Sequence, residues 1–570
     1  MSADRTAPVS RTPSRPLIGS RHLAIAQETW WAVAAVVAAL ALAVPLISVV
    51  WIGMTKSDGT WSHLVATVLP TALSNSILLM AGAGVATLIM GTAAAWLITM
   101  HRFPGRTLAD RLLVLPLAMP VYIVAYAYVE LLDYAGPIQS ALRHALGVSS
   151  AADYTFPQIR SLGGAIAIFA LVLYPYVYLT ARASFEQQSV CVLEVARTLG
   201  RTAGQTFYSV ALPLARPALA AGVLLVLMES LNDLGAVQYL GVETLSSSIY
   251  ATWMQRGSLS GAAQISLVML SLIAVLLVSE RALRGGGGFQ ATTGRYRAIP
   301  FETLDGWRAW LALSLVLLPT VLGFFVPFLV LASQAIAHVG TADLAAFARS
   351  ATNSIVLAAL ASAVAILFAL IFAYAVRLYR GRITHTTSQV ASLGYALPGT
   401  VLAIGLVSPL AGFDNGIDAW MRANIGVSTG LMLSGSLFAV TFALVIRFLA
   451  VALGSVDAGL QRISTNLDAA ARTLGSGGVM TLWRVHLPIL APALGAAGLL
   501  VFVDAMKELP ATLLLRPFNF DTLATYVYGL TASEQFEEAS LGAITIVLIG
   551  LIPVLWLHRA ISEGRSRSGA

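Results

Sequence analysis

Residues 194–219 read EVARTLGRTAGQTFYSVALPLARPAL, and residues 469–494 read AAARTLGSGGVMTLWRVHLPILAPAL. The two segments match at a constant offset of 275 residues, which places Gly200 in register with Gly475. A constant offset over a whole segment indicates that the chain contains one structural unit twice. We therefore expect each half of the protein to carry this segment at an equivalent place.

Each copy of the segment predicts a short surface helix, a turn and a second helix. Arginines and small residues lead to a glycine, which is typical of a helix end. A Leu-Pro pair follows, and because proline is tolerated at the start of a helix, the pair should mark the entry into the next span. The residues that define this pattern are Ala196, Gly200, Leu212 and Pro213 in the first copy and Ala471, Gly475, Leu487 and Pro488 in the second.

The composition of the 570 residues is that of a membrane protein. Hydrophobic residues make up 58% of the chain and charged residues only 11%, which excludes ordinary soluble domains. The net charge of +7 does not indicate nucleic-acid binding, because most arginines fall in short loops on one side of the expected spans, as the positive-inside rule requires. Cys191 is the only cysteine, so an intrachain disulfide and a Cys-based metal site are excluded.

We expect an all-α polytopic membrane protein with about twelve spans in two parallel six-helix repeats, because that many apolar stretches are long enough to cross a bilayer. Six spans return the chain to its starting side, so an axis along the membrane normal can relate the two halves. SNSI at 74–77 and TNSI at 352–355, at an offset of 278, extend the repeat over most of each half. The expected spans are 30–53, 72–99, 113–130, 162–180, 214–234, 262–280, 307–332, 352–376, 387–410, 429–452, 489–508 and 541–558.

Polar segments divide the chain further. The first is rich in Pro, Ser and Arg and predicts a disordered tail, and the central one is rich in Gly and Arg and predicts a flexible linker. The expected divisions are a tail at 1–28, a first half at 29–281, a linker at 282–305, a second half at 306–559 and a tail at 560–570, with the repeated segments in connecting loops at 189–213 and 463–488. The basic residues predict that both termini and both loops face the cytoplasm.

Four carboxylates lie in the spans that follow the repeated segments. At the offset of 275, Glu229 corresponds to Asp504 and Asp233 to Glu508. Each half thus has two acids four residues apart, which predicts one helix face, and the helical rise puts them in the outer half of the bilayer. A carboxylate at such a depth costs about 2.5 to 3.5 kcal/mol unless it faces a polar cavity or a partner. We therefore predict a hydrophilic translocation pathway, whose oxygen ligands suit hard cations.

Two explanations of these acids need no translocation pathway, and both stay open. Lys507 is the one basic residue that we expect within the spans, and it could neutralise Asp504 by an i,i+3 pair. Asp233 and Glu508 could instead lie at the outer water interface and be solvated there.

Tyr174, Tyr176 and Tyr178 lie on both sides of Pro175 near the end of a span. Their phenol oxygens could contribute to a site. An aromatic belt at the membrane interface explains them better.

The repeated segment resembles the EAA loop of the permease subunits of ABC importers. That loop has an acid and two small residues, then a glycine and a Leu-Pro pair, and the first copy supplies Glu194, Val195 and Ala196 as its core. The second copy departs, because Ala469 stands at the place of the acid, with Asp468 beside it. The resemblance implies that each loop forms a coupling helix in a groove of an ATPase subunit. The alternative is an amphipathic connector without a partner.

Longer tracts resemble the fused permeases of bacterial ferric-iron ABC importers, which have the type I fold. These tracts are YPYVYLTARASFEQ, LMESLNDLGAVQYLGVETLSSSIY and MKELPATLLLRPFNFDTLATYVYGL. The resemblance implies an inner-membrane permease that moves Fe(III) inward by alternating access from a periplasmic binding protein. It implies transient contact of Fe³⁺ with the four acids, and two copies of a cytoplasmic ATPase that hold ATP and Mg.

The chain itself has no GxxxxGK[ST] phosphate loop, so it cannot hold ATP by that device. We expect neither enzymatic activity nor a bound cofactor on this chain. Two alternatives remain: the same machine with another cargo, such as thiamine, a polyamine or a phosphonate, and an ion-gradient-driven transporter in which the carboxylates carry protons.

Overall fold

The structure is a computed structural model that describes residues 18–55, 59–187, 202–284, 302–379 and 381–568. Three predicted site residues of the first coupling loop, Glu194, Ala196 and Gly200, lie outside the described residues, as does Cys191. Most of the predicted N-terminal tail and of the central linker also lies outside them.

The described chain is almost entirely helical, which confirms the all-α fold class. Eleven of its helices are long and apolar enough to cross a membrane, and a bent pair, Arg106–Ala118 with Val121–Leu146, brings the number to 12 if it counts as one span. The strands in the described ranges are β1 (His101–Arg102) and β2 (Glu302–Thr303), which pair in parallel. This pairing fixes the end of the linker beside the first connector of the first half.

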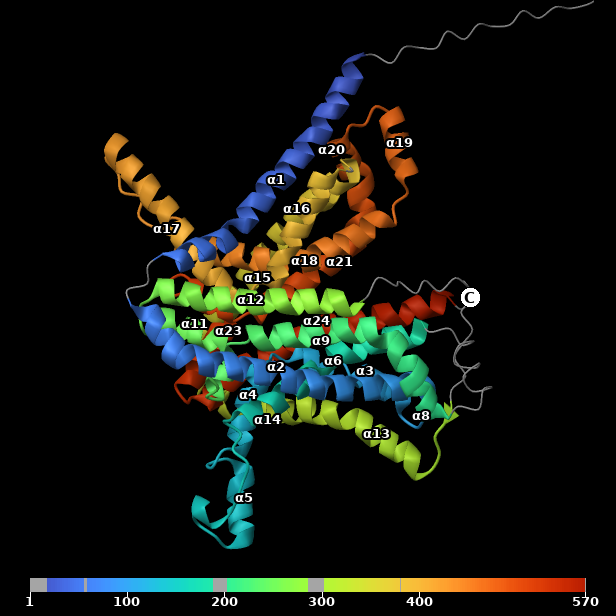
Figure 1. Cartoon of the computed structure of the whole chain (residues 1–570), viewed down its shortest axis with the longest axis vertical. Coiled ribbons are helices and arrows are strands. Elements are labelled where there is room, and N and C mark those ends of the chain that lie inside the picture. Colours follow the sequence, from blue (N-terminus) through green and yellow to red (C-terminus); the bar gives the residue numbers. More distant parts are fainter. Residues whose placement is uncertain (1–17, 56–58, 188–201, 285–301, 380, 569–570) are drawn as a thin grey trace, which may run out of the picture.

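Both halves are built from the same series of elements, which bears out the duplication seen in the sequence (Figure 1). The first half consists of α1 (Ile18–Met54), α2 (Thr60–Met100), α3 (Arg106–Leu112), η1 (Leu115–Ala118), α4 (Val121–Leu132), α5 (Pro137–Leu146), η2 (Ala151–Asp153), α6 (Leu162–Gln187), α8 (Ala203–Thr206), η3 (Phe207–Ala211), α9 (Leu212–Asn232), α10 (Gly235–Tyr239), α11 (Leu245–Met254) and α12 (Leu259–Arg284). The second half consists of α13 (Trp307–Thr320), η4 (Val321–Phe325), α14 (Val326–His338), α15 (Leu344–Leu378), α16 (Arg382–Ser392), η5 (Leu393–Ala396), α17 (Gly399–Asn424), α18 (Leu437–Gln461), α19 (Thr465–Thr473), α20 (Gly478–Thr481), η6 (Leu482–His486), α21 (Leu487–Met506), α22 (Pro510–Leu515), α23 (Leu523–Ala532) and α24 (Phe536–Ser568).

The SNSI and TNSI motifs form hydrogen bonds to equivalent loops in the two halves. Asn75 donates a side-chain hydrogen bond to the carbonyl oxygen of Glu243 at 3.0 Å. Asn353 donates the matching bond to the carbonyl oxygen of Asp521 at 2.9 Å. The sequence repeat therefore reflects a repeated tertiary contact between the second long helix of each half and the loop before α11 or α23.

Two predicted spans, 113–130 and 387–410, are wrong in their bounds. In the first half the chain bends by 94° between η1 and α4, and in the second half α17 begins only at Gly399. A proline precedes each new helix: Pro120 has φ −58° and ψ 142°, and Pro398 has φ −61° and ψ 144°. Because proline cannot continue the helix before it, each break falls at this residue.

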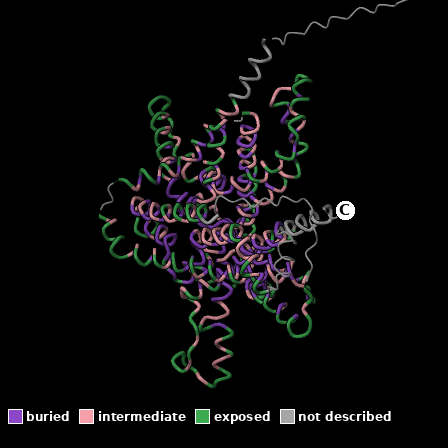
Figure 2. The backbone as a smooth tube through the Cα atoms, turned by 45° about the vertical axis from the view of Figure 1, so that its right-hand side comes forward, coloured by how far each residue is buried: buried purple, intermediate pink, exposed green. Residues whose placement is uncertain are grey.

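The first helices of each half pack against the opposite half. α1 packs against α15, α16 and α17, while α13 and α14 pack against α2, α3 and α4. One buried hydrophobic cluster spans both halves, and burial is concentrated in the centre of the molecule, whereas the projecting arms are exposed (Figure 2). Small residues allow close helix packing, since a Cβ on Gly91 of α2 would lie 2.8 Å from the backbone nitrogen of Tyr178 in α6.

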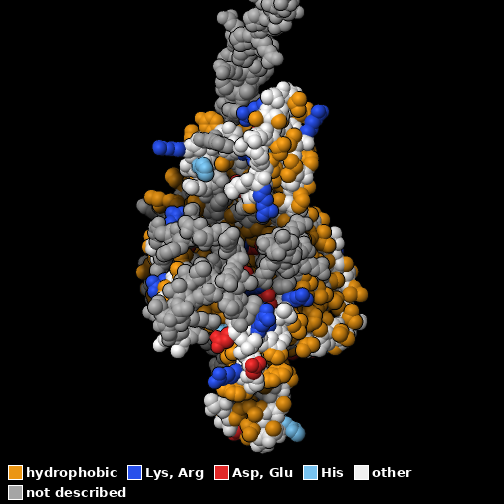
Figure 3. All heavy atoms as spheres, turned by 90° about the vertical axis from the view of Figure 1, so that its right-hand side faces the viewer, with side chains coloured by type: hydrophobic (Ala, Val, Ile, Leu, Met, Phe, Trp, Pro, Cys, Tyr) orange, Lys and Arg blue, Asp and Glu red, His pale blue; other side chains and the backbone are white. Residues whose placement is uncertain are grey.

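The two halves run in the same direction. In Figure 1, α8 and α19, which belong to the two repeated segments, lie toward the right of the picture with the C-terminus, while α11 and α23 lie at the left. Figure 3 looks at the right-hand face, over which Lys and Arg side chains are spread. The helices α5 and the second part of α17 project from the body as separate arms.

Candidate functional site

Helices α9 and α21, which follow the repeated segments, end at equivalent points. α9 stops one residue before Asp233, whose backbone is extended with φ −67° and ψ 138°. α21 likewise stops before Glu508. The expectation that each pair of acids shares a helix face is therefore wrong, because the second acid of each pair lies in a break between helices.

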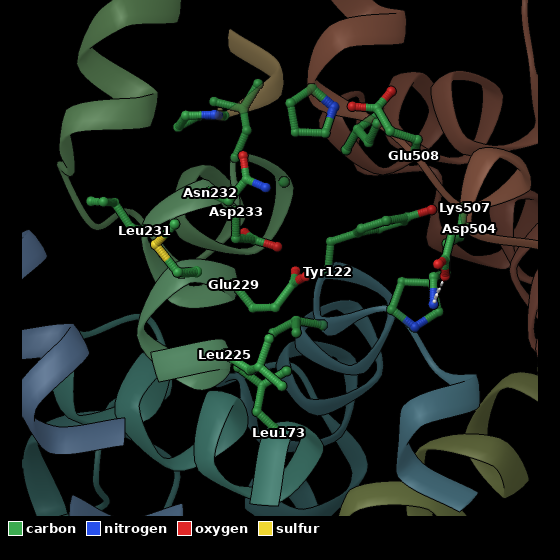
Figure 4. A pocket seen from close by; sticks show the side chains of 18 of the residues that line it. Tyr122, Leu173, Leu225, Glu229, Leu231, Asn232, Asp233, Asp504, Lys507 and Glu508 are labelled. Atoms are coloured by element: carbon green, nitrogen blue, oxygen red, sulfur yellow. Dashed lines mark ion pairs between the residues drawn. The ribbon is translucent and has the colours of Figure 1, made fainter. Parts of the chain in front are cut away.

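A cavity of about 140 Å³ lies between the halves at these breaks (Figure 4). Equivalent elements of the two halves form its walls: the segments leading into α4 and α17, the middles of α6 and α18, and the ends of α9 and α21. The structure brings all four predicted carboxylates to this cavity, namely Glu229, Asp233, Asp504 and Glu508. A polar space between the halves is thus present where the sequence predicted one.

Asp233 caps the short helix α10. Its Oδ1 accepts hydrogen bonds from the backbone N–H groups of Ala236 at 2.8 Å and Val237 at 3.3 Å. A carboxylate at a helix N-terminus satisfies N–H groups that have no partner within the helix and complements the helix dipole. This capping accounts for Asp233 structurally.

Glu508 has the same function in the second half. Its carboxylate accepts from the backbone N–H of Ala511 at 2.8 Å, and from the backbone N–H and the hydroxyl of Thr512 at 3.0 and 2.7 Å. Its side chain is only 2% exposed, and Arg447 lies 3.3 Å away. Glu508 is therefore fully engaged by its surroundings rather than solvated at an outer interface.

Two cationic side chains reach the cavity, and both come from the second half. Lys507 lies 2.9 Å from Asp504, so the pair that the sequence suggested is present. The expectation that Lys507 is the one basic residue within the spans is wrong, because Arg447 lies in the middle of α18 and pairs with Glu508. The signal was an arginine inside the apolar stretch predicted at 429–452.

The equivalent positions of the first half carry no cation. Asn232 stands where the second half has Lys507, and Val172 stands where it has Arg447. Asn232 instead accepts a hydrogen bond from the backbone N–H of Gly399 at 3.1 Å. Among the described residues, Glu229 forms neither a hydrogen bond nor an ion pair, and its carboxylate points into the cavity in Figure 4.

Three tyrosines line the cavity, namely Tyr122, Tyr176 and Tyr395. Sequence reasoning missed Tyr122 and Tyr395, and it named Tyr176 as a possible site residue but favoured an aromatic belt. The expected aromatic belt is wrong for the motif around Pro175. Tyr174 is buried and donates to the carbonyl oxygen of Leu113 at 2.9 Å, and Tyr178 is buried and donates to Asp110 at 2.5 Å. The alternation of buried and cavity-facing positions along α6 depends on its neighbours, which the sequence does not reveal.

The four carboxylates surround the cavity without converging on one point. In the described part of the chain, no three His, Cys, Asp or Glu side chains lie close enough together to hold a metal ion. Direct ligation of Fe³⁺ by all four acids at once therefore has no support in this conformation. Asp233 and Glu508 are committed to backbone groups, and Asp504 is committed to Lys507.

The second repeated segment has the predicted form. Helix α19 begins after Ser464, whose side chain accepts from the backbone of Asn466, and it ends just before Gly475. Gly475 has φ 78°, the left-handed conformation that favours glycine at a helix C-terminus. Ala471 is buried, and α21 begins at the Leu487–Pro488 pair.

In both repeated segments a widened helical turn precedes the membrane span. The five-residue π-helices η3 and η6 stand directly before Leu212–Pro213 and Leu487–Pro488. Proline has no N–H to offer the carbonyl one turn earlier, so the turn before it can widen. The proline thus marks the entry to the span without interrupting the helix.

Asp468 does not replace the missing acid as a free group. Its carboxylate lies 2.8 Å from Nη2 of Arg377 on α15 and 2.7 Å from Nε2 of His486. Arg377 also donates to the carbonyl oxygens of Leu460 and Ile463 at 2.7 and 3.1 Å. This cluster attaches α19 to the spans behind it.

The chain is similar to known components of membrane transport systems. Residues 87–284 match the family described as binding-protein-dependent transport system inner membrane component. The chain is 25% identical over 540 residues to the Fe(3+)-transport system permease protein FbpB 2 of Haemophilus influenzae, an alignment that covers 93% of this chain and 98% of that protein.

Shorter alignments reach permeases of other systems. The sulfate transport system permease protein CysT of Escherichia coli is 32% identical over 206 residues, which is 35% of this chain and 71% of that protein. The molybdenum transport system permease protein ModB of Escherichia coli is 29% identical over 197 residues, or 33% of this chain and 82% of that protein. These relatives are permease subunits and not enzymes. The chain belongs to the family of inner membrane components of binding-protein-dependent transport systems.

Proposed function

We propose that this permease imports ferric iron, using ATP that is hydrolysed by separate subunits. The observation that carries the proposal is the cavity between the two halves, which all four carboxylates line. The alignment along nearly the whole of a Fe(3+)-transport permease supports the same cargo. Oxygen donors such as carboxylates suit hard cations.

The charges of the cavity argue against an anionic cargo. Four carboxylates line it, and the two cations there, Arg447 and Lys507, are each paired with one of the acids. Anion pathways use Arg or Lys side chains or helix N-termini that are free to meet the anion. Here two such N-termini, those of α10 and α22, are already occupied by Asp233 and Glu508. The phosphonate alternative is therefore disfavoured.

A cationic organic cargo, such as thiamine or a polyamine, is the second candidate. The acids would accept it equally well in terms of charge. The cavity volume of about 140 Å³ lies below the range of about 300–1,000 Å³ that is typical of small-molecule sites. The size of the cavity therefore favours a metal ion over an organic cation.

The repeated segments are the proposed contacts for the ATPase. Leu474, beside the glycine turn of the second copy, is 85% exposed, and an exposed apolar side chain at the tip of a short helix suits insertion into a groove of a partner. Two equivalent segments call for two copies of the ATPase, each with its own ATP and Mg. We place these segments and both termini on the cytoplasmic side.

The way in which the halves are joined supports alternating access. The cavity walls belong to both halves, so a rotation of one half against the other would open one side of the cavity and close the other. α19 is attached to α15 by the Arg377–Asp468 pair, so a movement of the ATPase would be transmitted to that half. The binding protein would dock on the opposite face, at the end of the bundle where α11 and α23 lie.

Iron uptake by cells that lack this chain tests the proposal. Uptake should be lost and should return when the chain is supplied again. It should fail when the ATPase subunit carries a substitution in its phosphate loop, and it should persist with an uncoupler while ATP is maintained. Uptake that survives the ATPase substitution and collapses with the uncoupler would instead show an ion-gradient-driven transporter.

A further inference from the structure

The matching acids of the two halves have different surroundings. Glu229 and Asp504 are equivalent at the offset of 275, yet Asp504 is paired with Lys507 at 2.9 Å. Glu229 has no hydrogen bond or ion pair among the described residues. A carboxylate in such a place is costly without a partner, so the first-half wall of the cavity lacks a positive charge that the second-half wall already contains.

Phenol oxygens without partners line the cavity that this carboxylate faces. Tyr176 and Tyr395 line the same cavity as Glu229. Neither hydroxyl forms a hydrogen bond within the described ranges. These two tyrosines come from opposite halves, α6 and η5, so a ligand held by both would bridge the interface between the halves.

Tyr122 adds a third unpartnered hydroxyl. It is 4% exposed, and its oxygen is buried without a hydrogen-bond partner in the described chain. Figure 4 shows its side chain crossing the cavity between the Glu229 wall and the Asp504–Lys507 wall. Buried hydroxyls are nearly always hydrogen-bonded, so this hydroxyl is available to a water or ion in the cavity.

We propose that Glu229, Tyr176 and Tyr395 form the cargo-binding subsite of the cavity, an all-oxygen site for a hard trivalent cation, with Tyr122 beside it. This inference rests on the proposed function and deepens it, because it assigns the contact to one carboxylate rather than to four. Asp233 and Glu508 hold the broken helices in place. Asp504 is neutralised by Lys507 when the cavity is empty.

The proposal is tested with terbium(III), a hard trivalent cation whose emission is sensitised by nearby tyrosine. The purified full-length chain in detergent is titrated with Tb³⁺ and the tyrosine-sensitised emission is recorded. Glu229→Gln should weaken the affinity by at least about tenfold, because the site loses its only free charge. Glu229→Asp should recover most of it, and Tyr176→Phe with Tyr395→Phe should lower both affinity and sensitised emission.

Two controls give the test its specificity. Asp305→Asn removes an exposed acid between β2 and α13 that does not line the cavity and should leave the titration unchanged. The double variant Asp504→Asn with Lys507→Gln removes the matching acid without changing the net charge, and it should weaken binding clearly less than Glu229→Gln does. Size-exclusion profiles and circular dichroism confirm that each variant is folded.

Equal affinities of wild type and Glu229→Gln would overturn the assignment, as would an equal loss in the Asp504/Lys507 double variant. Such results would leave the proposed function standing if cells still required the chain for iron uptake. Conversely, cells that take up iron normally without the chain would refute the proposed function, whatever the Tb³⁺ titration shows.

Discussion

Arg377 and Asp468 form an ion pair with a nitrogen-to-oxygen distance of 2.8 Å, in which both side chains are almost fully buried. The pair joins α19, the proposed coupling helix, to α15, a membrane-spanning helix of the same half. His486 lies on the other side of Asp468, at the start of α21. Asp468 therefore links α19 to two spans, and we expect a movement of α19 to reach both.

Asp468→Asn should uncouple the second ATPase site. Removing one partner of a buried pair leaves the other charge uncompensated, at a cost of about 3–5 kcal/mol, and α19 would lose its attachment to α15. We expect uptake to fall by more than about tenfold, since each 1.4 kcal/mol corresponds to a factor of ten. ATP hydrolysis by the assembled complex should persist without cargo transport, which is measured in proteoliposomes.

Ala469→Glu provides the comparison for this variant. It restores the acid of the EAA pattern one residue along, on a different face of α19. If Asp468 acts through Arg377, the Asp468→Asn/Ala469→Glu chain stays uncoupled. Recovery of uptake in that chain would show instead that an acid is needed only at the ATPase surface.

Gly399→Ala should destabilise the cavity. A Cβ at this position would lie 2.8 Å from both Nη1 of Arg447 and Oε1 of Glu508, and 2.9 Å from the backbone nitrogen of Ala511. Overpacking of this kind costs about 1–3 kcal/mol. Gly412→Ala is the matched control in the same helix, since nothing lies within 4 Å of its added Cβ, and it should stabilise the helix by about 0.5–1 kcal/mol. Thermal unfolding in detergent should shift in opposite directions, and equal shifts would contradict the geometry.

Ser76→Ala and Ser354→Ala should destabilise the protein to a similar extent. Ser76 accepts a hydrogen bond from the backbone N–H of Leu245 at 2.9 Å, and Ser354 accepts from Leu523 at 2.7 Å. Each substitution leaves a buried N–H without a partner, at a cost of about 1–3 kcal/mol. Ser74→Ala removes an exposed hydroxyl that bonds only within its own helix and should have little effect on the unfolding midpoint.

The two serine sites belong to different halves, so their effects should add in the double variant. A strong effect at one site and none at the other would show that the two loops are not equivalent in energy, although their hydrogen bonds match. The measurement is the unfolding midpoint of the single and double variants in the same detergent.

The repeat and the class of protein could be read from the sequence because both depend on spacing along the chain. The offset between Gly200 and Gly475 predicted equivalent segments, and the described copy has the expected helix, left-handed glycine and Leu-Pro entry. The four acids were identified by the same offset, because it aligns the two acids of one half with the two acids of the other. All four reach one cavity because the halves pack around a common interface.

What each acid does depends on contacts that no spacing reveals. Asp233 and Glu508 cap short helices because α9 and α21 end just before them. Neither helix is followed directly by a proline, so the apolar sequence gives little sign that the helix ends there. Arg447 was detectable as a charge inside a span, but its pairing with Glu508 joins residues 61 positions apart. Tyr122 and Tyr395 look like ordinary apolar positions in the sequence, whereas Tyr176 stands out beside Pro175 but gives no sign that it faces a cavity.

Iron uptake into proteoliposomes that contain the permease, its ATPase and its binding protein is the decisive measurement for import through this cavity. The wild type should take up iron only when ATP is supplied, and Glu229→Gln should reduce uptake by more than about tenfold, with ATPase assembly unchanged. Undiminished iron uptake by Glu229→Gln, or uptake by the wild type without ATP, would contradict ATP-driven import through this cavity.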